Sequence, residues 1–174
     1  MVRVAVIVAE GSEEIELVTP IDVLRRSGAH VDIVSIDEYL VEGSHGIVIK
    51  ADTVVEALDW GDYDAYVIPG GMPGATNIYR NNYVKNLLTM AHKKGKLIAS
   101  ICASPAVVLA GYGLVNGRRV TCYPAPDFID MFVDATYTGA DVEVDGNIIT
   151  ANGPKSALDF SIAIADALGL EPKI

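Results

Sequence analysis

Four short apolar segments of the sequence constrain its fold more than any other feature. Residues 4–9, 31–36, 65–68 and 97–101 are dominated by Val, Ile, Leu and Ala and lack a regular polar alternation. A strand with one face in water shows a polar residue at every second position, whereas a strand covered on both faces does not. The four segments therefore predict strands of a parallel sheet that is buried between two layers.

Helical patterns separate these predicted strands. They cover residues 16–26, 82–94, 105–110 and 155–168, and a glycine follows each of them where a helix stop is expected: Gly28, Gly95, Gly111 and Gly169. Alternating strands and helices are typical of an α/β fold with right-handed crossovers. We expect a three-layer α/β/α sandwich with a mostly parallel central sheet.

Smaller elements complete the pattern. Residues 142–150 predict a β-hairpin around the turn Asp145-Gly146, and short strands are expected at residues 47–50 and 120–122. The sequence contains no repeat, linker or low-complexity segment. We therefore expect one domain over residues 1–174.

Charge and composition narrow the classes of partner. The chain carries a formal net charge of −10, so nucleic acids and anionic membranes are disfavoured. Its hydrophobic fraction of 51% supplies an ample core. Two cysteines cannot build a disulfide framework, and the apolar start at residues 1–9 is too short for a signal core or a membrane span. These features predict a cytoplasmic protein whose ligands are small molecules or proteins.

Cys102 is the residue with the clearest chemical potential. It directly follows the predicted strand at residues 97–101 and precedes Ser104, which can cap a helix, and Pro105, which suits a first helical turn. Small neighbouring residues are what a tight strand-to-helix elbow requires. The amino end of the helix at residues 105–110 would then favour a thiolate at Cys102. The alternative is an unreactive buried cysteine in a turn of small residues.

Two further loops are expected beside this cysteine. Ligands of parallel α/β sheets bind outside the carboxyl ends of the strands, and residues 10–16 and 69–74 each follow a predicted strand there. The first loop is rich in carboxylates, and the glycines of the second, Gly70 and Gly71 among them, let backbone amides approach a ligand. Together the three loops would supply a thiol, a carboxyl group and backbone donors, which suits covalent chemistry on a carbonyl group.

The polar residues of these loops have different expected roles. Glu13 and Glu14 suit a solvated helix start, whereas Glu16 lies between two apolar residues, where burial would raise its pKa and keep it protonated. A nucleotide site at the glycine loop is disfavoured, because its spacing is not that of a phosphate-binding loop. The histidines show no metal-ligand spacing, so no metal or other cofactor is predicted. His45 is interpreted as a loop tip, with a contact near the site as the alternative.

The motifs in combination resemble those of the DJ-1/ThiJ/PfpI superfamily. They are residues 9–16 (AEGSEEIE), 22–28 (DVLRRSG), 69–71 (PGG), 101–105 (ICASP) and 152–154 (NGP), which span nearly the whole chain. The resemblance is strongest to the deglycase-like branch associated with parkinsonism, and it implies a flavodoxin-like fold and a homodimer. It also implies that Cys102 is the nucleophilic, easily oxidised cysteine, with Glu16 as its carboxyl partner and the amides of Gly71 and Ala103 as the oxyanion hole. Arg26 matches a residue near the family's dimer interface.

The chain departs from the family pattern at three points. The peptidase branch has a histidine directly after its cysteine, where this chain has Ala103, so a peptidase is disfavoured. The deglycase-like branch often has a histidine at the position of Tyr123, and a phenol with a pKa of about 10 is a poor proton shuttle at neutral pH. The sequence also ends at Ile174 without the additional C-terminal helix of some members, which predicts a more open pocket.

Three hypotheses for the function follow. The first is an enzyme that converts small reactive carbonyls such as methylglyoxal to hydroxy acids, as glyoxalases and deglycases do, through Cys102 and Glu16. The second is a redox-responsive stress or chaperone-like protein in which Cys102 is oxidised to a sulfinate. The third is an inactive site in a protein that acts through its dimer surface.

Overall fold

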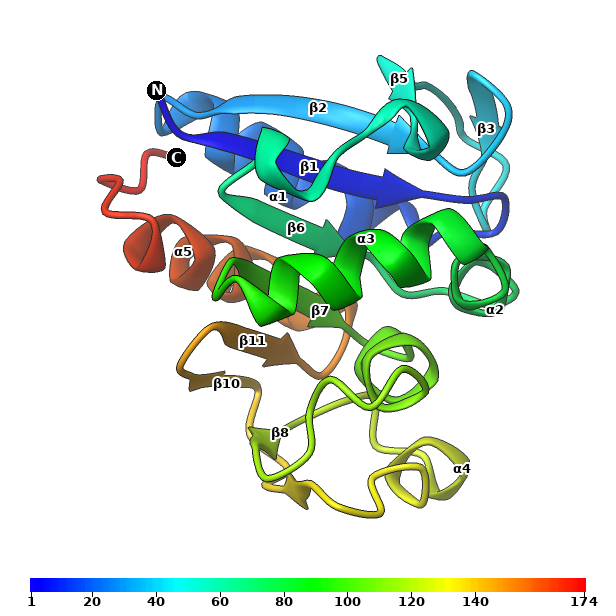
Figure 1. The fold of residues 1–174 in the computed structure, drawn as a ribbon, viewed down its shortest axis with the longest axis vertical. Helices are drawn as coiled ribbons and strands as arrows, with labels where there is room; N and C mark the ends of the chain where they lie inside the picture. The colour runs from blue at the N-terminus through cyan, green and yellow to red at the C-terminus, as the bar shows by residue number, and fades with distance from the viewer.

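A seven-stranded sheet forms the middle layer of the structure (Figure 1). The structure is a computed structural model and describes all of residues 1–174. The strand order is β10-β11-β7-β6-β1-β2-β5, and every neighbouring pair is parallel except β10 and β11. The strands are β1 (Arg3–Val8), β2 (His30–Ser35), β5 (Thr53–Val54), β6 (Ala65–Ile68), β7 (Leu97–Ile101), β10 (Val142–Asp145) and β11 (Ile148–Ala151). The expected parallel sheet and the hairpin at its edge are confirmed.

Helices cover both faces of this sheet. On one face, α1 (Glu14–Arg26) packs beside α5 (Ala157–Ala167). The other face is covered by α2 (Gly74–Tyr79), α3 (Asn82–Lys93) and the six-residue π-helix η3 (Pro105–Ala110) (Figure 1). Successive side chains of a strand point to opposite faces, so β1 contributes Val6 to one apolar core and Ile7 to the other. The three-layer arrangement is confirmed.

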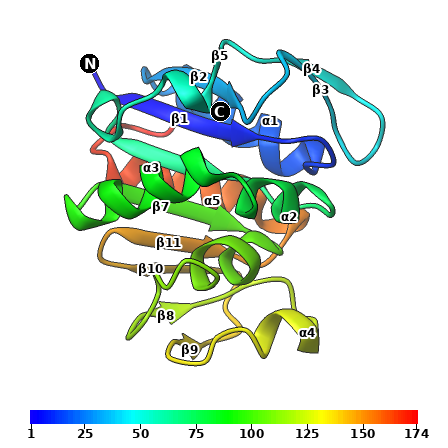
Figure 2. The same cartoon turned by 45° about the vertical axis from the view of Figure 1, so that its right-hand side comes forward.

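The remaining elements are short. The antiparallel strands β3 (Leu40–Glu42) and β4 (Val48–Lys50) form a hairpin that extends beyond the edge of the sheet (Figure 2). At the opposite edge, β8 (Arg119–Val120) pairs with β9 (Thr136–Tyr137), and α4 (Pro126–Ile129) lies nearby. Single 3-10 turns are η1 (Val55–Ala57), η2 (Trp60–Asp62) and η4 (Pro154–Ser156). None of the helices is both long and apolar enough to cross a membrane.

The differences from the expected elements have simple causes. The sequence pattern missed α2, α4, β3, β5 and β9, because elements of two to six residues are too short to show a hydrophobic period. Helix α1 begins two residues earlier than expected, since the Glu13 side chain caps it by accepting a hydrogen bond of 3.0 Å from the amide of Glu16. The expected strands at residues 47–50 and 120–122 are shorter, and neither joins the main sheet.

The strand order places a topological switch point at the carboxyl edge of the sheet. Strand β1 leads into α1 on one face, whereas its neighbour β6 leads into α2 on the other. Ligands of open α/β sheets bind at such points, where the two following loops diverge. The loop after β7, which contains Cys102, follows the strand next to β6.

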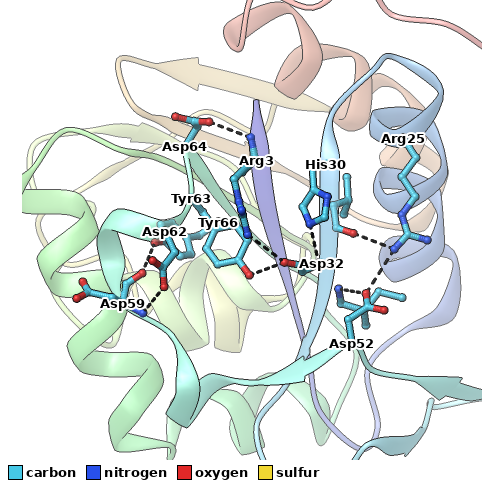
Figure 3. Close-up of polar contacts among 12 residues, drawn as sticks. Arg3, Arg25, His30, Asp32, Asp52, Asp59, Asp62, Tyr63, Asp64 and Tyr66 are labelled. Atoms are coloured by element: carbon cyan, nitrogen blue, oxygen red, sulfur yellow. Dashed lines mark hydrogen bonds and ion pairs between the residues drawn. The ribbon is translucent and has the colours of Figure 1, made fainter. Parts of the chain in front are cut away.

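A polar network holds the amino edge of the sheet (Figure 3). Asp32 on β2 accepts a hydrogen bond of 2.7 Å from the hydroxyl of Tyr63, and it lies 3.0 Å from His30 and 3.6 Å from Arg3. The Arg3 guanidinium also lies over the Tyr63 ring, 5.3 Å from its centroid. Burial and the neighbouring Asp32 raise the pKa of Tyr63 far above its ordinary value, so its phenol remains a donor. The network joins β1 and β2 to the segment before β6.

Candidate active site

Cys102 lies in a left-handed turn between β7 and η3. Its φ is +66°, the only positive φ outside glycine, and this conformation is costly for a residue with a Cβ. The amide of Cys102 donates to the carbonyl of Ala151, and its carbonyl accepts from the amide of Tyr123, both at 2.9 Å. The expected strained elbow is confirmed, and bonds to two neighbouring segments hold it with the thiol half-buried.

Ser104 does not cap η3 as expected. Its side chain makes no capping hydrogen bond; the buried hydroxyl donates instead to the carbonyl of Pro69. Pro69 begins the glycine loop after β6. Ser104 therefore links the cysteine elbow to that loop rather than to its own helix.

Glu16 lies on the first turn of α1 and is 0% exposed. Its Oε1 accepts a hydrogen bond of 3.0 Å from the amide of Gly70, and its Oε2 is buried without a partner of normal geometry. Burial, assisted by the charge of Glu13, raises the pKa of Glu16 to about 7, against the opposing hydrogen bonds of Cys102 and Gly70. The expected rise of this pKa is confirmed, but a value of about 7 keeps Glu16 protonated only below that pH.

The glycine loop approaches both groups so closely that it has no room for side chains. A Cβ on Gly70 would lie 2.6 Å from the Cβ of Cys102 and 2.6 Å from Oε1 of Glu16. Gly71 has a φ of +88°, and a Cβ there would lie 2.6 Å from the amide nitrogen of Glu13. The three loops named from the sequence are thus brought together at the carboxyl edge.

The pKa of Cys102 differs from the expectation. The amides of Ala103 and Gly71 interact with its sulfur and favour the thiolate. Burial first, and then the charge and hydrogen bonding of Glu16, outweigh them and raise the pKa of Cys102 to about 12. The predicted lowering of the thiol pKa is therefore wrong. The two groups form a coupled pair in which an ionised Glu16 faces a protonated Cys102 above about pH 7.

Glu13 and Glu14 are not the solvated helix start that the sequence suggested, since both are buried. Glu14 accepts hydrogen bonds from the amides of His45 and Ile47, at 2.8 and 3.2 Å, and from the hydroxyl of Ser44 at 3.2 Å. Although burial acts to raise it, the hydrogen bonds from His45 and Ile47 lower the pKa of Glu14 to about 2. Glu14 therefore anchors the loop at residues 43–47 to the start of α1.

His45 is an exposed residue of this loop at residues 43–47 and lies beside Glu13 and Glu14. Its side chain is 69% exposed, and Nδ1 lies 3.0 Å from Oε1 of Glu14 and 3.4 Å from Oε1 of Glu13. These three residues form the one cluster in which three possible metal ligands lie within 4.8 Å of one another. Their hydrogen bonds to α1 and to the loop account for this arrangement.

Tyr123 and Arg26 differ in their relation to the elbow. Tyr123 adjoins it through its amide, and its ring meets that of Phe128 edge-on with centroids 6.5 Å apart. Arg26 lies on the last turn of α1, ten residues from Glu16 or about 15 Å along the helix axis. There it pairs with Asp22 at 2.7 Å. Arg26 is therefore separate from the site of its own chain.

A polar cavity that the sequence did not reveal lies beside the elbow. A pocket of about 610 Å³ is lined by Tyr123 and by the loop after β11, including Asn152 and Lys155. Asn152 accepts a hydrogen bond of 2.6 Å from the hydroxyl of Ser156 and donates one of 3.0 Å to Asp141. The motif at residues 152–154 was the signal that could have located this cavity.

Comparisons with known proteins agree with this architecture. The model of the DJ-1/PfpI family matches residues 2–167. The Parkinson disease protein 7 homolog of Danio rerio is 37% identical over 169 residues, which cover 95% of this chain and 89% of that protein. Protein DJ-1 homolog B of Arabidopsis thaliana is 34% identical over 168 residues, which cover 95% of this chain and 38% of that protein. The chain thus spans about two fifths of the length of the Arabidopsis relatives.

Solved structures extend the similarity to three dimensions. Toxoplasma gondii DJ-1 in an oxidized form has a TM-score of 0.91 at 42% identity, covering 97% of this chain and 91% of that one. Drosophila melanogaster DJ-1beta has a TM-score of 0.89 at 34% identity, covering 96% and 90%. The matched length includes β1, the glycine loop and the cysteine elbow. The chain therefore belongs to the DJ-1/PfpI family.

Proposed function

We propose that the protein is a cysteine-dependent enzyme that converts small 2-oxoaldehydes such as methylglyoxal to 2-hydroxy acids. The observation that carries the proposal is the coupling of Cys102 to Glu16, whose pKa of about 7 suits a general base near neutral pH. Membership of the DJ-1/PfpI family and the resemblance to its deglycase-like branch support the same chemistry.

The reaction begins with addition of the thiol to the aldehyde carbon. The Glu16 carboxylate accepts the Cys102 proton while the S–C bond forms, so a free thiolate is not needed beforehand. The carbonyl oxygen becomes an oxyanion, which the amides of Gly71 and Ala103 stabilise. Glu16 then protonates the oxyanion, and the hemithioacetal results.

Glu16 next moves a second proton. It removes the hydrogen from C1 of the hemithioacetal as a proton, which forms an enediolate, and delivers this proton to C2. The proton of the C1 hydroxyl passes to the C2 oxygen, so that C1 becomes the carbonyl carbon of a thioester of the hydroxy acid. Water attacks the thioester carbon, the S–C bond breaks, and Cys102 regains its proton as the acid leaves. The net reaction adds one water and needs no external oxidant or reductant.

Tyr123 is the proposed auxiliary hydrogen-bond donor beside the elbow. Because a phenol exchanges protons poorly near neutral pH, we expect turnover about 100-fold below that of a member with histidine at this position. Replacing Tyr123 with His should recover part of that factor.

Lactate formation from methylglyoxal in the absence of glutathione tests the proposal. The wild type should form lactate, and Cys102→Ser and Glu16→Gln should not. Cys122→Ser is the matched control, because Cys122 is the other cysteine of the chain and is buried in the apolar core. Equal rates for the wild type and Cys102→Ser would refute the enzyme proposal.

Redox sensing is a second candidate, favoured by the neighbour Toxoplasma gondii DJ-1, whose structure is described as oxidized. Two molecules of hydrogen peroxide would each transfer one oxygen to Cys102 and leave as water, and the thiol would become a sulfinic acid. Protonated Glu16 and the amides of Gly71 and Ala103 would donate to the sulfinate oxygens. Peptide mass analysis after mild peroxide should find two added oxygens on Cys102; oxygens on Cys122 instead, or none, would exclude this role.

We also propose a homodimer. Five large apolar side chains are exposed on α1 and on the β3–β4 hairpin: Ile15, Val18, Leu40, Ile47 and Val48. Glu14 and His45 hold the hairpin loop against α1, so the two exposed groups adjoin. Analytical ultracentrifugation should show a dimer that Val48→Asp converts to a monomer, whereas Val144→Asp on the edge strand β10 leaves it intact. A monomeric wild type would contradict the proposal.

A further inference from the structure

An apolar groove lies next to the cysteine elbow, among α2, η3 and α4. Its volume is about 460 Å³, and none of its lining residues is charged. Met72, Tyr79 and Met131 line it and are 49%, 40% and 45% exposed. Large apolar side chains that gather at one exposed place are typical of a binding surface.

Two residues that line this groove are neighbours of residues that contact Cys102. Met72 directly follows Gly71, whose amide faces the sulfur of Cys102. Phe128 lines the groove and meets the ring of Tyr123, whose amide is bonded to the carbonyl of Cys102. Tyr123 also lines the polar cavity of about 610 Å³. It therefore contacts both this cavity and, through Phe128, the wall of the apolar groove.

Close packing fixes the Tyr79 ring in the wall of the groove. A Cβ on Gly111 would lie 2.6 Å from Cε1 of Tyr79, so this glycine lets the Tyr79 ring pack against the end of η3. The ring also stacks on that of Tyr112, with centroids 5.2 Å apart, and the Tyr112 hydroxyl donates to the Tyr79 carbonyl at 2.7 Å. Met72 and Met131 add flexible side chains that can adapt to different occupants.

The size and lining of the groove suit part of a small molecule. Small-molecule sites have volumes of about 300–1,000 Å³ and are mostly apolar, with a few polar groups that fix orientation. Here the uncharged lining offers contact to an apolar chain, and the adjacent elbow supplies the polar and reactive groups.

We propose that this groove receives the alkyl or aryl chain of aldehydes whose carbonyl group reacts at Cys102. The protein should then prefer longer 2-oxoaldehydes to methylglyoxal. The class of substrate, 2-oxoaldehydes, rests on the proposed function. The preference for a longer alkyl or aryl chain rests on the volume and the uncharged lining of the groove.

A series of 2-oxoaldehydes with unbranched chains from methyl to pentyl tests the preference. The kcat/KM should rise with length by up to about fourfold for each methylene that enters the groove, chiefly through a lower KM. Met131→Asp places a charge in the groove and should abolish the rise with chain length. Val133→Asp is the matched control, because Val133 is 84% exposed and outside the groove.

The outcomes separate this inference from the proposed function. Turnover of methylglyoxal with a flat or falling series in the wild type would overturn the groove and leave the enzyme in place. A preference for hydroxylated chains would place them in the polar cavity and would likewise overturn it.

A second measurement does not depend on turnover. The rates at which N-methylmaleimide and N-hexylmaleimide alkylate Cys102, each divided by the rate of the same reagent with glutathione, should favour the hexyl reagent at least tenfold. Met131→Asp should lose this preference and Val133→Asp should keep it. If the preference is present without any oxoaldehyde turnover, the proposed function fails and the groove stands; no preference in the wild type refutes the groove.

Discussion

The amide of Gly70 donates a hydrogen bond of 3.0 Å to Oε1 of Glu16 and fixes the carboxyl group beside Cys102. Gly70 follows β6 and Glu16 belongs to the helix after β1, so this bond crosses the switch point of the sheet. It occupies Oε1, while Oε2 is buried without a hydrogen-bond partner. The reactive pair therefore depends on backbone geometry as much as on its two side chains.

Gly70→Ala should disrupt the site. The new Cβ would overlap the Cβ of Cys102, Oε1 of Glu16 and the carbonyl of Ile101, which lies 2.8 Å away. We expect the rate at which iodoacetamide alkylates Cys102 to fall about 100-fold, because small displacements of reacting groups slow reactions by that factor. The free energy of unfolding in urea should fall by about 1–3 kcal/mol.

Gly61→Ala is the control for this change. Gly61 has no neighbouring atom within 4 Å of an added Cβ and no positive φ. Both the alkylation rate and the stability should stay near those of the wild type. If the two alanine variants behave alike, the close contact at Gly70 is not what shapes the site.

The pH dependence of Cys102 alkylation should show the titration of Glu16. As the pH rises through about 7, Glu16 loses its proton and can accept that of the thiol, so the rate should rise with a midpoint there. Glu16→Gln should remove this step and leave only a rise at the higher pH where the thiol itself ionises. Glu38→Gln, at an exposed position, should keep the wild-type profile; a step near pH 7 that survives in Glu16→Gln would contradict the assignment.

The same pKa predicts the pH dependence of stability. The pKa of Glu16 in the folded chain lies above its unfolded value of 4.5, so the folded state binds more protons between about pH 4.5 and 7. The contribution of Glu16 to stability is therefore full below pH 4.5 and is lost as the pH rises through about 7. The difference in free energy of unfolding between Glu16→Gln and the wild type, measured in urea, should therefore shift in favour of the variant between pH 4.5 and pH 8. The expected shift is on the order of 3 kcal/mol.

The sequence was sufficient for most strands of the sheet and for the cysteine elbow. The apolar segments predicted the bounds of four strands to within one residue at each end. Burial on both faces leaves a continuous run of apolar residues, which can be recognised from the sequence alone. The position of Cys102 between a strand and a helix start likewise predicted a strained elbow, which the structure shows as a φ of +66°. These features are local, so local residues determine them.

The charge states of Cys102 and Glu14 could not be read from the sequence. A helix start near Cys102 suggested a lowered thiol pKa, but η3 has only six residues, and burial beside Glu16 acts in the opposite direction. Glu14 was interpreted as solvated, although a loop thirty residues away covers it. The depth of burial and the partner of each carboxyl group depend on segments that are distant in the chain.

Glu14→Gln should release the loop at residues 43–47. The folded pKa of Glu14 is lowered to about 2 from 4.5, so its contribution to stability is present above pH 4.5 and is lost as the pH falls toward 2. The variant should therefore unfold at lower urea concentration than the wild type at pH 7, and the difference should shrink below pH 4.5. Hydrogen exchange at the amides of His45 and Ile47 should increase, and unchanged protection there would show that Glu14 does not anchor the loop.

Tyr63→Phe should weaken the amino edge of the sheet without affecting the site. The Tyr63 hydroxyl donates at 2.7 Å to Asp32, which is 18% exposed, and its loss leaves that carboxylate with His30 and Arg3 alone (Figure 3). A hydrogen bond to a charged group at such a position contributes about 1.5–3 kcal/mol, so the free energy of unfolding should fall by that amount. Tyr83→Phe is the control, because its hydroxyl donates to Glu56 at 3.2 Å in an exposed pair, where the loss of stability should be much smaller than in Tyr63→Phe. Both variants should alkylate at Cys102 at the wild-type rate, since no hydrogen bond joins either hydroxyl to Cys102 or Glu16. A slower rate in Tyr63→Phe would mean that the amino edge of the sheet is coupled to the site.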